Sequence, residues 1–345
     1  MVSSKLDRSV ASRDPLTHGW LTMTFTVNQV IGNYECLGLI DKPKTGLTYK
    51  VRNLATGEIE SLRALPGATS RDPELAERLL REIRVQARLS HPNILEFHDA
   101  FEIDGRLVMT TEFVDAPTLA ELCRAGALPL RDAIGAIIQV LDGLEQAHAL
   151  GIVHRGITAD HVTLTRDGVA KLSGFDLAKP VSDTNLTRMG TVAGDPRYLA
   201  PEQVMGQVTL DGRSDLYSVG VLLYQTLTGK LPFDAKNDID VLAAQVSSEP
   251  LPPSKVNPTM SPELEQIVLT ALTKDPNNRF ASAKEFRAAL AALDVRSEPT
   301  VVSRPDPVSL NLDMRHKPRR LTLPIVFGLL ALAIGALLLA WLPIH

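Results

Sequence analysis

Cysteine is scarce in this sequence, which has Cys36 and Cys123 as its only two thiols in 345 residues. Two cysteines are too few for a disulfide framework, and no cluster of histidine and cysteine surrounds either of them. The sequence therefore predicts neither a disulfide scaffold nor a zinc site, and we expect no resident metal. A reducing compartment is the default expectation for such a chain.

The chain also lacks an excess of charge of one sign. Its 36 lysine and arginine residues nearly balance 40 aspartate and glutamate residues, which leaves a net charge of -4. Domains that bind nucleic acid normally carry a strongly basic surface, so we expect no nucleic-acid partner. Hydrophobic residues make up 44% and charged residues 22% of the sequence. That balance is ordinary for folded proteins and excludes disorder throughout.

The N-terminal segment lacks the uninterrupted apolar stretch of a secretory signal peptide. Charged side chains are scattered through residues 1–20, and residues 21–27 then alternate apolar side chains with threonine. A period of two favours a short extended segment. We interpret residues 1–29 as an N-terminal extension without a readable function.

The C-terminus is different, because residues 321–344 contain no charged side chain. At a rise of about 1.5 Å per residue, an apolar helix of this length spans the roughly 30 Å hydrocarbon core of a bilayer. The cationic residues just before it are Arg315, His316, Lys317, Arg319 and Arg320. The positive-inside rule places such a cluster on the cytoplasmic side. The sequence thus predicts a C-terminal tail anchor, preceded by a proline-rich basic linker at 295–320.

The part between these ends, residues 30–294, changes its periodicity once. Up to about residue 115, short β-branched and apolar runs are broken by Gly, Pro and Asp, and one helical pattern covers 73–89. Beyond about residue 118 the helical period dominates, as in 128–150, 212–228, 262–272 and 283–293. A strand-rich first part followed by a helix-rich second part predicts the α+β class.

Five short strings in this part occur in a defined order. They are SHPNI (90–94), GIVHR (151–155), YLAPEQ (198–203), SDLYSVGVLLYQTLTGKLPF (214–233) and KDPNNRF (274–280). In order and spacing they resemble the bacterial serine/threonine protein kinases of the eukaryotic-like, Hanks type. The resemblance covers roughly residues 30–294. It implies a two-lobed protein kinase fold, with a sheet-rich N-lobe up to about residue 115 and a helical C-lobe after it.

The resemblance also assigns the nucleotide-binding positions. The three glycines of the phosphate-binding loop, which let the backbone close over phosphates, fall on Asp41, Pro43 and Gly46. Asp41 repels phosphate, and Pro43 removes an amide donor. Lys44 or Lys50 remains open as a displaced phosphate-binding lysine, although a solvated lysine is the simpler interpretation.

The N-lobe lysine that contacts the α- and β-phosphates in the family is replaced by Arg63. Its usual glutamate partner on the N-lobe helix is retained as Glu82. An arginine and a glutamate can form a bidentate pair, but a planar guanidinium does not reproduce a compact ammonium. We therefore expect the pair to support architecture. The hinge that would hold adenine falls on Glu112 and Phe113.

The catalytic loop departs further from the family, since it reads HRGITADH. Gly156 stands at the position of the base aspartate, and His161 replaces the metal-binding asparagine. Thr158 replaces the loop lysine, and Asp195 replaces the threonine that bonds to both of the missing groups. These linked changes indicate that the hydrogen-bond network of the family's catalytic loop is absent from this sequence.

The second metal-binding position is also changed. In the string SGFD, Gly174 occupies the position of the magnesium-binding aspartate and Phe175 retains the aromatic residue. Asp176 lies two residues along the chain, several ångströms from the required place. Asp176 as a metal ligand and Asp160 as a base are thus weak surrogates. No catalytic residue of the family is intact.

Residues that support the fold in the family are retained. Glu202 and Arg279 match a buried ion pair of the C-lobe, and Asp215 matches the aspartate that anchors the catalytic loop. His154 and Phe175 match members of an apolar spine that links the lobes. The residues that support the fold in the family are therefore retained, whereas those that take part in catalysis are not.

The size of the expected loss in turnover rate favours a binding function over catalysis. A general base contributes about 10²–10⁴ in rate, and metal charge stabilisation contributes several kcal/mol. Losing roughly six decades from a turnover of about 1–100 s⁻¹ leaves on the order of 10⁻⁵ s⁻¹. The sequence therefore predicts a pseudokinase at the cytoplasmic membrane face that acts as a signalling scaffold or allosteric regulator.

Two alternatives stay open. The chain could be an active serine/threonine kinase that uses Asp160 or Asp176, or a sensor that binds ATP without magnesium. The expected partner is the membrane together with an active protein kinase or another membrane-associated signalling protein. Thr187 and Thr191 are candidate phosphorylation sites, because Arg155 is retained where the family commonly binds a phosphate.

Overall fold

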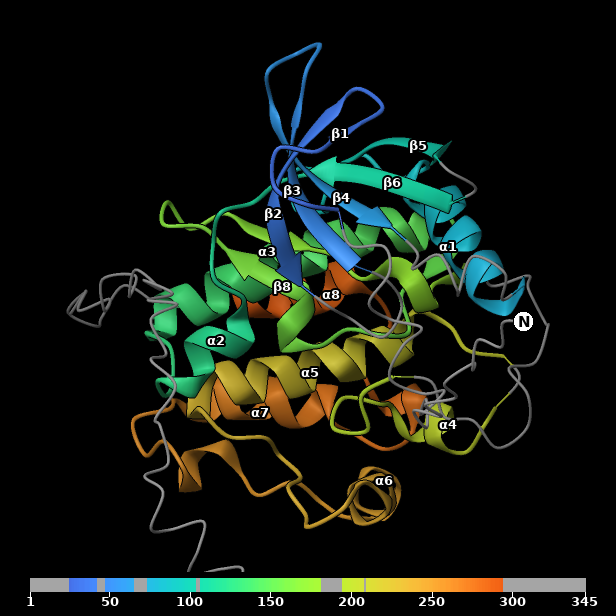
Figure 1. Ribbon diagram of the computed structural model, residues 1–345. Helices are drawn as coiled ribbons and strands as arrows, with labels where there is room; N and C mark the ends of the chain where they lie inside the picture. Colours follow the sequence, from blue (N-terminus) through green and yellow to red (C-terminus); the bar gives the residue numbers. More distant parts are fainter. Residues whose placement is uncertain are drawn as a thin grey trace, which may run out of the picture. The chain divides into compact units, whose positions relative to one another are not determined.

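An antiparallel sheet of six strands forms the first part of the protein, with the strand order β1-β2-β3-β4-β6-β5 (Figure 1). The strands are β1 (Val30–Ile31), β2 (Tyr34–Asp41), β3 (Leu47–Asn53), β4 (Ile59–Ala64), β5 (Phe97–Ile103) and β6 (Arg106–Glu112). The computed structural model describes residues 25–41, 47–64, 73–103, 106–180, 194–207 and 209–293. Statements about structure refer to these residues.

One face of the sheet is the N-lobe core. Tyr49, Val51, Leu62 and Val108 are almost fully buried and belong to one apolar cluster. They come from three neighbouring strands, and their alternation with less buried residues follows the period of two of a strand. Their strand neighbours, including Arg63, point to the opposite face of the sheet.

Helix α1 (Pro73–Gln86) packs against that opposite face. Its Leu79 is buried in a second cluster together with Met109 of β6. The side chain of Met109 is on the same face as that of Arg63, because the two residues are directly paired across β4 and β6. The sheet register therefore sets which polar side chains face α1.

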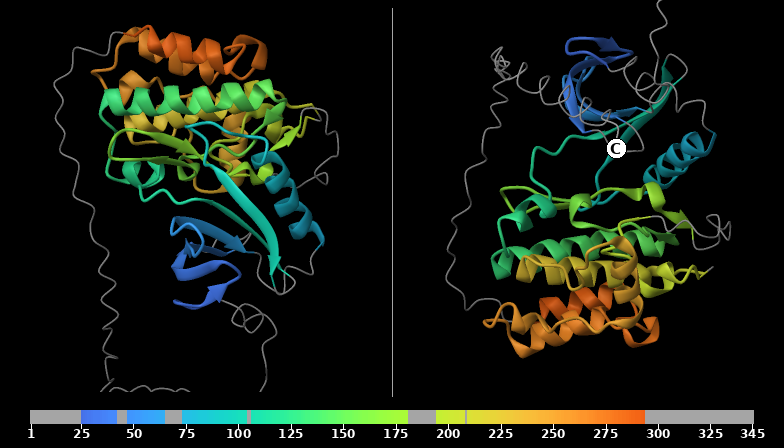
Figure 2. Two further views of the ribbon diagram at one scale, coloured as in Figure 1. Left: turned by 90° about the horizontal axis from the view of Figure 1, so that it is seen from above. Right: turned by 60° about the horizontal axis from the view of Figure 1, so that its bottom comes forward.

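The second part of the protein is helical (Figure 2). Its helices are α2 (Leu119–Arg124), α3 (Leu130–Ala149), α4 (Pro201–Val204), α5 (Gly212–Thr228), α6 (Asp238–Ser247), α7 (Pro262–Ala271) and α8 (Ala283–Ala291). Helix α5 is buried along nearly its whole length. The side chain of Asp211 caps its first turn by accepting from the amide of Arg213.

Short elements between α3 and α4 position the polar groups of the site. They are β7 (Ile152–Val153), η2 (Ala159–His161), β8 (Val162–Leu164), β9 (Ala170–Leu172), η3 (Phe175–Leu177) and β10 (Lys179–Pro180). β8 pairs with β9, and β7 pairs with β10. These pairings hold the loop 154–161 next to the turn 173–177.

The α+β, two-lobed fold predicted from the sequence is confirmed. The helix predicted at 212–228 has those bounds, and the predictions at 128–150, 262–272 and 283–293 differ by one or two residues at an end. The helix predicted over 73–89 ends at Gln86, because the next residues form a tighter turn with bonds such as Leu89 N to Gln86 O.

Both terminal predictions fall largely or wholly outside the described residues. The apolar segment 321–344, the linker 295–320 and most of the extension 1–29 are among the positions whose structure is not described. Within the described ranges, none of the helices has the length and apolarity required to cross a bilayer. The tail anchor therefore stays a prediction.

Candidate functional site

An ion pair joins the sheet to α1 on the face described above. Nη1 of Arg63 donates to Oε1 of Glu82 at 2.8 Å and to Oε2 at 2.9 Å. Glu82 is 3% exposed. A buried charge pair of this geometry is favourable only while both partners are present. The structure thus brings Arg63 and Glu82 together and fixes α1 against β4.

The hinge residue Glu112 bonds with its side chain to both lobes. Its Oε1 accepts from Nζ of Lys171 at 2.7 Å and from the amide of Glu96 at 2.8 Å. Lys171 belongs to β9 and Glu112 ends β6, so this carboxylate connects the sheet to the helical part. Sequence reasoning assigned Glu112 to adenine binding and missed this ionic role.

Lys50 contacts the second hinge residue. Its ammonium lies 4.2 Å from the centroid of the Phe113 ring, a cation–π geometry. The sequence left Lys50 open as a displaced phosphate-binding lysine. Its described contact is with the aromatic ring at the end of β6.

The loop after β7 is anchored by a buried carboxylate from α5. Asp215 is 1% exposed and accepts from the amides of His154 at 2.9 Å and Arg155 at 2.8 Å. Nε2 of His148 lies 2.8 Å from the same carboxylate. Burial raises the pKa of Asp215, but the His148 hydrogen bond, the His148 charge and the backbone donor Arg155 outweigh it and hold that pKa below its usual value.

His154 links this loop to the turn that follows β9. Its Nδ1 accepts from the amide of Gly156 at 3.2 Å, which leaves Nε2 to donate to the carbonyl of Ser173 at 3.0 Å. Its ring centroid lies 4.4 Å from that of Phe175. Both side chains are fully buried and pack on each other.

The two positions that the sequence resemblance assigns to metal binding, His161 and Gly174, lie against each other. Gly174 has φ of +85°, in the left-handed region that favours glycine. A Cβ added there would lie 2.6 Å from Cγ and from Cδ2 of His161. Nδ1 of His161 donates to the carbonyl of Gly156 at 2.6 Å, which holds the ring in this place. The imidazole therefore fills the space into which a side chain at position 174 would extend.

The base position is also covered by an apolar group. A Cβ added to Gly156 would lie 3.1 Å from Cδ1 of Leu177. Leu177 belongs to η3, directly after Phe175. Gly156, which the resemblance assigns to the base position, thus has no functional group and faces a leucine side chain.

Asp195 pairs locally and not with the catalytic loop. Its Oδ1 accepts from the amide of Arg197 at 3.0 Å and from Nε at 2.9 Å, and its other oxygen accepts from Nη2. The hydrogen bond to Asp195 raises the pKa of Arg197, and Asp160 contributes to the same shift by its charge. Asp160, the surrogate base, is exposed.

Several predicted site residues lie outside the described part. Gly46, Thr187 and Thr191 belong to segments whose structure is not described. The backbone of Asp176 lies in η3, but its side chain is not described. Within the described ranges, no group of three or more histidine, cysteine or acidic side chains has the arrangement of a metal site.

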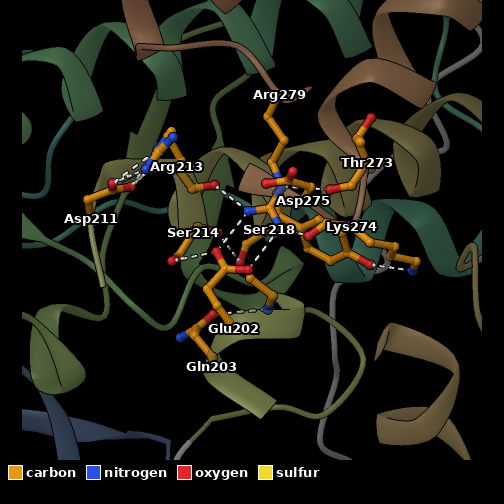
Figure 3. A network of polar contacts seen from close by, with 12 residues as sticks. Glu202, Gln203, Asp211, Arg213, Ser214, Ser218, Thr273, Lys274, Asp275 and Arg279 are labelled. Atoms are coloured by element: carbon orange, nitrogen blue, oxygen red, sulfur yellow. Dashed lines mark hydrogen bonds and ion pairs between the residues drawn. The ribbon is translucent and has the colours of Figure 1, made fainter. Parts of the chain in front are cut away.

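A buried ion pair braces the helical part (Figure 3). Nη1 and Nη2 of Arg279 each lie 2.8 Å from an oxygen of Glu202. The remaining donors of the guanidinium reach the carbonyls of Thr273, Lys274 and Arg213, so all five N–H groups are used. Ser214 Oγ also donates to Glu202 at 2.7 Å. This pair connects α4 to the turn before α8.

A buried amide on α1 was not noticed in the sequence. Gln86 lies one helical turn after Glu82 and is 2% exposed. Its Oε1 is buried and has no hydrogen-bond partner among the described residues. A glutamine four residues after a buried glutamate on one helix face is the signal that would have indicated it.

Comparison with known proteins gives the class of this fold and site. The chain matches the family model of the protein kinase domain over residues 34–290. It is 37% identical over 269 residues to a probable serine/threonine-protein kinase of Streptomyces coelicolor, which covers 76% of this chain and 40% of that protein. The chain therefore belongs to the protein kinase family.

Two further relatives come from Mycobacterium tuberculosis. The serine/threonine-protein kinase PknJ is 35% identical over 77% of this chain and 46% of its own length. The crystal structure of the PknI kinase domain matches with a TM-score of 0.61 and 26% identity, over 78% of this chain and 99% of that chain. The matched region thus spans less than half of the Streptomyces kinase and of PknJ. It spans nearly the whole of the PknI kinase domain.

Proposed function

We propose that this chain is a pseudokinase, a catalytically impaired protein kinase domain that acts by binding as a signalling scaffold or allosteric regulator. The observation that carries the proposal is the contact between His161 and Gly174. In the family these two positions supply oxygen ligands to magnesium, and here they supply an imidazole and no side chain.

Magnesium does not fit this pair of positions. The ion prefers an octahedral shell of oxygen ligands, whereas Nδ1 of His161 is engaged with the carbonyl of Gly156 at 2.6 Å. The imidazole ring also lies where an aspartate at position 174 would extend. We therefore derive no catalytic step through a metal for this chain.

The retained architecture supports a binding role. Arg63 and Glu82 form their pair, Asp215 anchors the loop, and Phe175 packs on His154. These contacts maintain the two-lobed shape that a partner would recognise. A binding function requires that shape and not the base or the metal.

Phosphoryl transfer by the full chain tests the proposal. The chain is incubated with radiolabelled ATP, a general protein substrate and either magnesium or manganese. We expect no transfer above the background set by heat-inactivated protein. Metal-dependent transfer that is lost in an Asp176→Asn variant and kept in an Asp167→Asn variant would overturn the proposal.

An active serine/threonine kinase is the second candidate function. The similarity to proteins named as serine/threonine kinases favours it, as do the formed Arg63–Glu82 pair and the packed Phe175. Asp176 or Asp160 would then have to replace the missing carboxylates. The transfer assay described above separates this candidate from the pseudokinase.

A metal-independent ATP sensor is distinguished by thermal denaturation. Specific binding stabilises the folded state by RT ln(1 + [L]/Kd). A rise in Tm with ATP in the presence of EDTA would support a sensor, and a rise that requires magnesium would support the enzyme. No rise in either condition would support a scaffold that needs no nucleotide.

We propose the cytoplasmic membrane face as the location. The support is the uncharged segment 321–344 and the cationic cluster before it. The full chain should remain with bacterial membranes after carbonate extraction, and a chain that ends at residue 320 should not. Release of the full chain by carbonate would contradict the tether.

The proposed partner is an active protein kinase at the same membrane. Arg155 is retained in the catalytic loop, and Thr187 and Thr191 lie in the segment that such kinases phosphorylate. Incubation of the full chain with an active membrane kinase should place phosphate within 180–200. Phosphate found only elsewhere would count against these two sites.

A further inference from the structure

Helix α6 has apolar side chains on its outer side as well as on its inner side. Val241 and Gln245 are buried on the inner side, and α6 contacts α4. Residues 239, 242, 243 and 246 are apolar and follow the spacing i, i+3, i+4 and i+7, which places them together on the outer face of α6. Ile239 of this outer face is 77% exposed. An exposed apolar stripe with polar residues at its rim is typical of an interaction surface.

The first turn of α6 adds negative charge beside this outer face. Asp234, Asp238 and Asp240 are exposed before and within that turn, and Lys236 is the one cation among residues 234–240. Three carboxylates and one ammonium leave an excess of negative charge. The side chain of Asp240 accepts from Nδ2 of Asn237 at 2.9 Å, and this donor is neutral. The carboxylates are therefore available to a cationic partner.

The outer face of α1 carries the opposite charge. Leu80 is 37% exposed, and Arg84 follows one helical turn later on the same side. Arg88 extends this surface beyond the last turn, because its Nη2 donates to the carbonyl of Leu150 at 3.1 Å. Leu150 is itself 39% exposed. The ion pairs of α1 in the described part of the chain involve other residues, so both arginines lack a carboxylate partner there.

The two outer faces match in length and in the order of their groups. Residues 239–246 of α6 and 80–87 of α1 each extend about 10 Å at a rise of about 1.5 Å per residue. In an antiparallel arrangement the acidic start of α6 lies beside Arg84 and Arg88, and Val246 at its other end lies beside Leu80. The positive end of one helix dipole then lies near the negative end of the other. Opposite charges and exposed apolar side chains therefore coincide along one line of contact.

Within one copy of the chain the two faces cannot meet. Figure 1 shows α1 beside the sheet and α6 at the end of the helical part away from the sheet. We propose that the chain associates with a second copy of itself head to tail, with the outer face of α6 in one copy bound to the outer face of α1 in the other. Such a contact is heterologous, so each dimer keeps one free face of each kind and can add further copies. The proposal does not depend on the pseudokinase assignment.

This contact would act on the helix that carries Glu82. The inner face of α1 holds Glu82 against Arg63 of β4. A partner that binds the outer face of α1 in this position favours the conformation in which the ion pair is formed. One copy would in this way bias the conformation of the next.

Charge reversal tests the proposal with the full chain in a nonionic detergent. One variant carries Arg84→Glu with Arg88→Glu, and the other carries Asp238→Lys with Asp240→Lys. Size-exclusion chromatography with light scattering gives the protein mass at several concentrations. We expect the wild type to associate at low salt and less at high salt, and each variant alone to associate at least about tenfold more weakly. An equal mixture of the two variants should recover association, because it pairs an unchanged α6 with an unchanged α1.

Matched controls reverse charges at equivalent ends of other helices. Arg124→Glu changes a cation in the last turn of α2, and Glu263→Lys changes a carboxylate in the first turn of α7. Both residues are exposed, so these variants reproduce the effect on a helix dipole without changing either face. They should associate as the wild type does. Ile239→Ser leaves every charge in place and should weaken association at both salt concentrations.

Hydrogen exchange of the wild type locates the contact without any variant. Peptides from 73–90 and 238–247 should be protected at high protein concentration, and peptides from 283–291 should not. A wild type whose mass does not change with concentration overturns the proposal, and so does association that is equal in the wild type and both charge variants. Weakening in the α1 variant alone would assign its arginines to another acidic partner, such as an anionic lipid surface, and would also overturn it.

Discussion

At the scale of single residues, the site is defined by the His161 ring, which lies where a side chain at position 174 would extend. Because residue 174 is a glycine, its backbone can adopt the left-handed conformation, and the His161 ring can lie where a Cβ would otherwise be. Position 174 therefore offers no room for a side chain, because the His161 ring occupies that space. The hydrogen bond from His161 to Gly156 keeps it filled.

Substitution of Gly174 should separate two contributions to the free energy of unfolding. One is the strain of a left-handed backbone, and the other is the steric contact with the His161 ring. Gly174→Ala should lower the free energy of unfolding by about 2–4 kcal/mol, of which the left-handed conformation accounts for about 1–2. Gly168 is the control, since it has φ of +83° and nothing within 4 Å of an added Cβ. Urea denaturation should show a smaller loss for Gly168→Ala.

The same measurement on a double variant tests the coupling. His161→Ala combined with Gly174→Ala should recover the part of the loss that the contact causes, with an interaction energy of about 1–3 kcal/mol. Strict additivity of the two changes would contradict the packing described here. An equal loss for Gly168→Ala and Gly174→Ala would do the same.

A prediction on pH follows from Asp215. Its pKa is held below the usual value in the folded state, so its contribution to stability is present above the unfolded pKa near 3.9 and is lost as pH falls through the folded pKa. Asp215→Asn should cost about 2–3 kcal/mol at pH 7. The gap between wild type and variant should narrow below about pH 4, as measured by urea denaturation across pH.

Exposed Asp160 is the control for that experiment. Asp160→Asn should change the stability little at any pH, because exposed charges contribute little to folding. A gap for Asp215→Asn that stays constant between pH 7 and pH 3 would show that the carboxylate is not the titrating group.

At the scale of elements, α1 carries both a favourable and an unfavourable buried polar group. Glu82 has its partner Arg63, and Gln86 one turn later has an amide oxygen without one. A buried acceptor without a hydrogen bond costs about 1–3 kcal/mol. The helix is therefore held by its ion pair and weakened by the next polar residue on the same face.

Replacement of Gln86 should stabilise the protein. Gln86→Met keeps a similar volume and removes the unpaired amide, so the free energy of unfolding should rise by about 1 kcal/mol. Gln139→Met is the control, because Oε1 of Gln139 accepts from Nδ2 of Asn93 at 2.8 Å and from the amide of Ala170 at 2.9 Å. Thermal or urea denaturation should show a gain for the first variant and none for the second.

The elements show how far the sequence could be interpreted. Helix α5 was predicted with its observed bounds, since its periodicity is long and its cap Asp211 is local in sequence. The assignment of Gly156, His161 and Gly174 to the base and metal positions rests on the resemblance and stays a prediction. The filling of the 174 position by the His161 ring could not be predicted, because it depends on backbone torsions and on a hydrogen bond across the loop.

Polar partners were the least predictable feature. Asp195 was expected to have lost its contacts with the catalytic loop, and the structure pairs it with Arg197. Lys50 was assigned either to phosphate or to solvent, and it lies over Phe113. A long charged side chain has several partners within reach, and only the folded arrangement decides among them.

At the scale of the whole molecule, two ionic contacts hold separate parts together. Lys171 and Glu112 connect β9 to the end of β6, and Glu202 and Arg279 connect α4 to the turn before α8. The second pair is almost fully buried, so neither partner can be removed without leaving an unpaired charge in the interior. The helical part depends on it more than on any exposed ion pair described here.

Removal of Arg279 should destabilise the whole domain. Arg279→Met should lower the free energy of unfolding by about 3–5 kcal/mol, because Glu202 would stay buried and charged. The double variant Glu202→Gln with Arg279→Met should lose less than the single one. Arg213→Met serves as the control, since the Arg213–Asp211 pair is partly exposed. Urea denaturation of the three variants decides the order.

The contact between His161 and Gly174 also limits which single substitutions could restore oxygen ligands at these positions. Restoring an aspartate at 174 while the imidazole is in place would produce a clash, and restoring an asparagine at 161 alone would leave the second ligand absent. A single change at either position therefore leaves the pair without two oxygen side chains. Under the pseudokinase proposal, both positions would have to change together before the pair could again supply two oxygen ligands to magnesium.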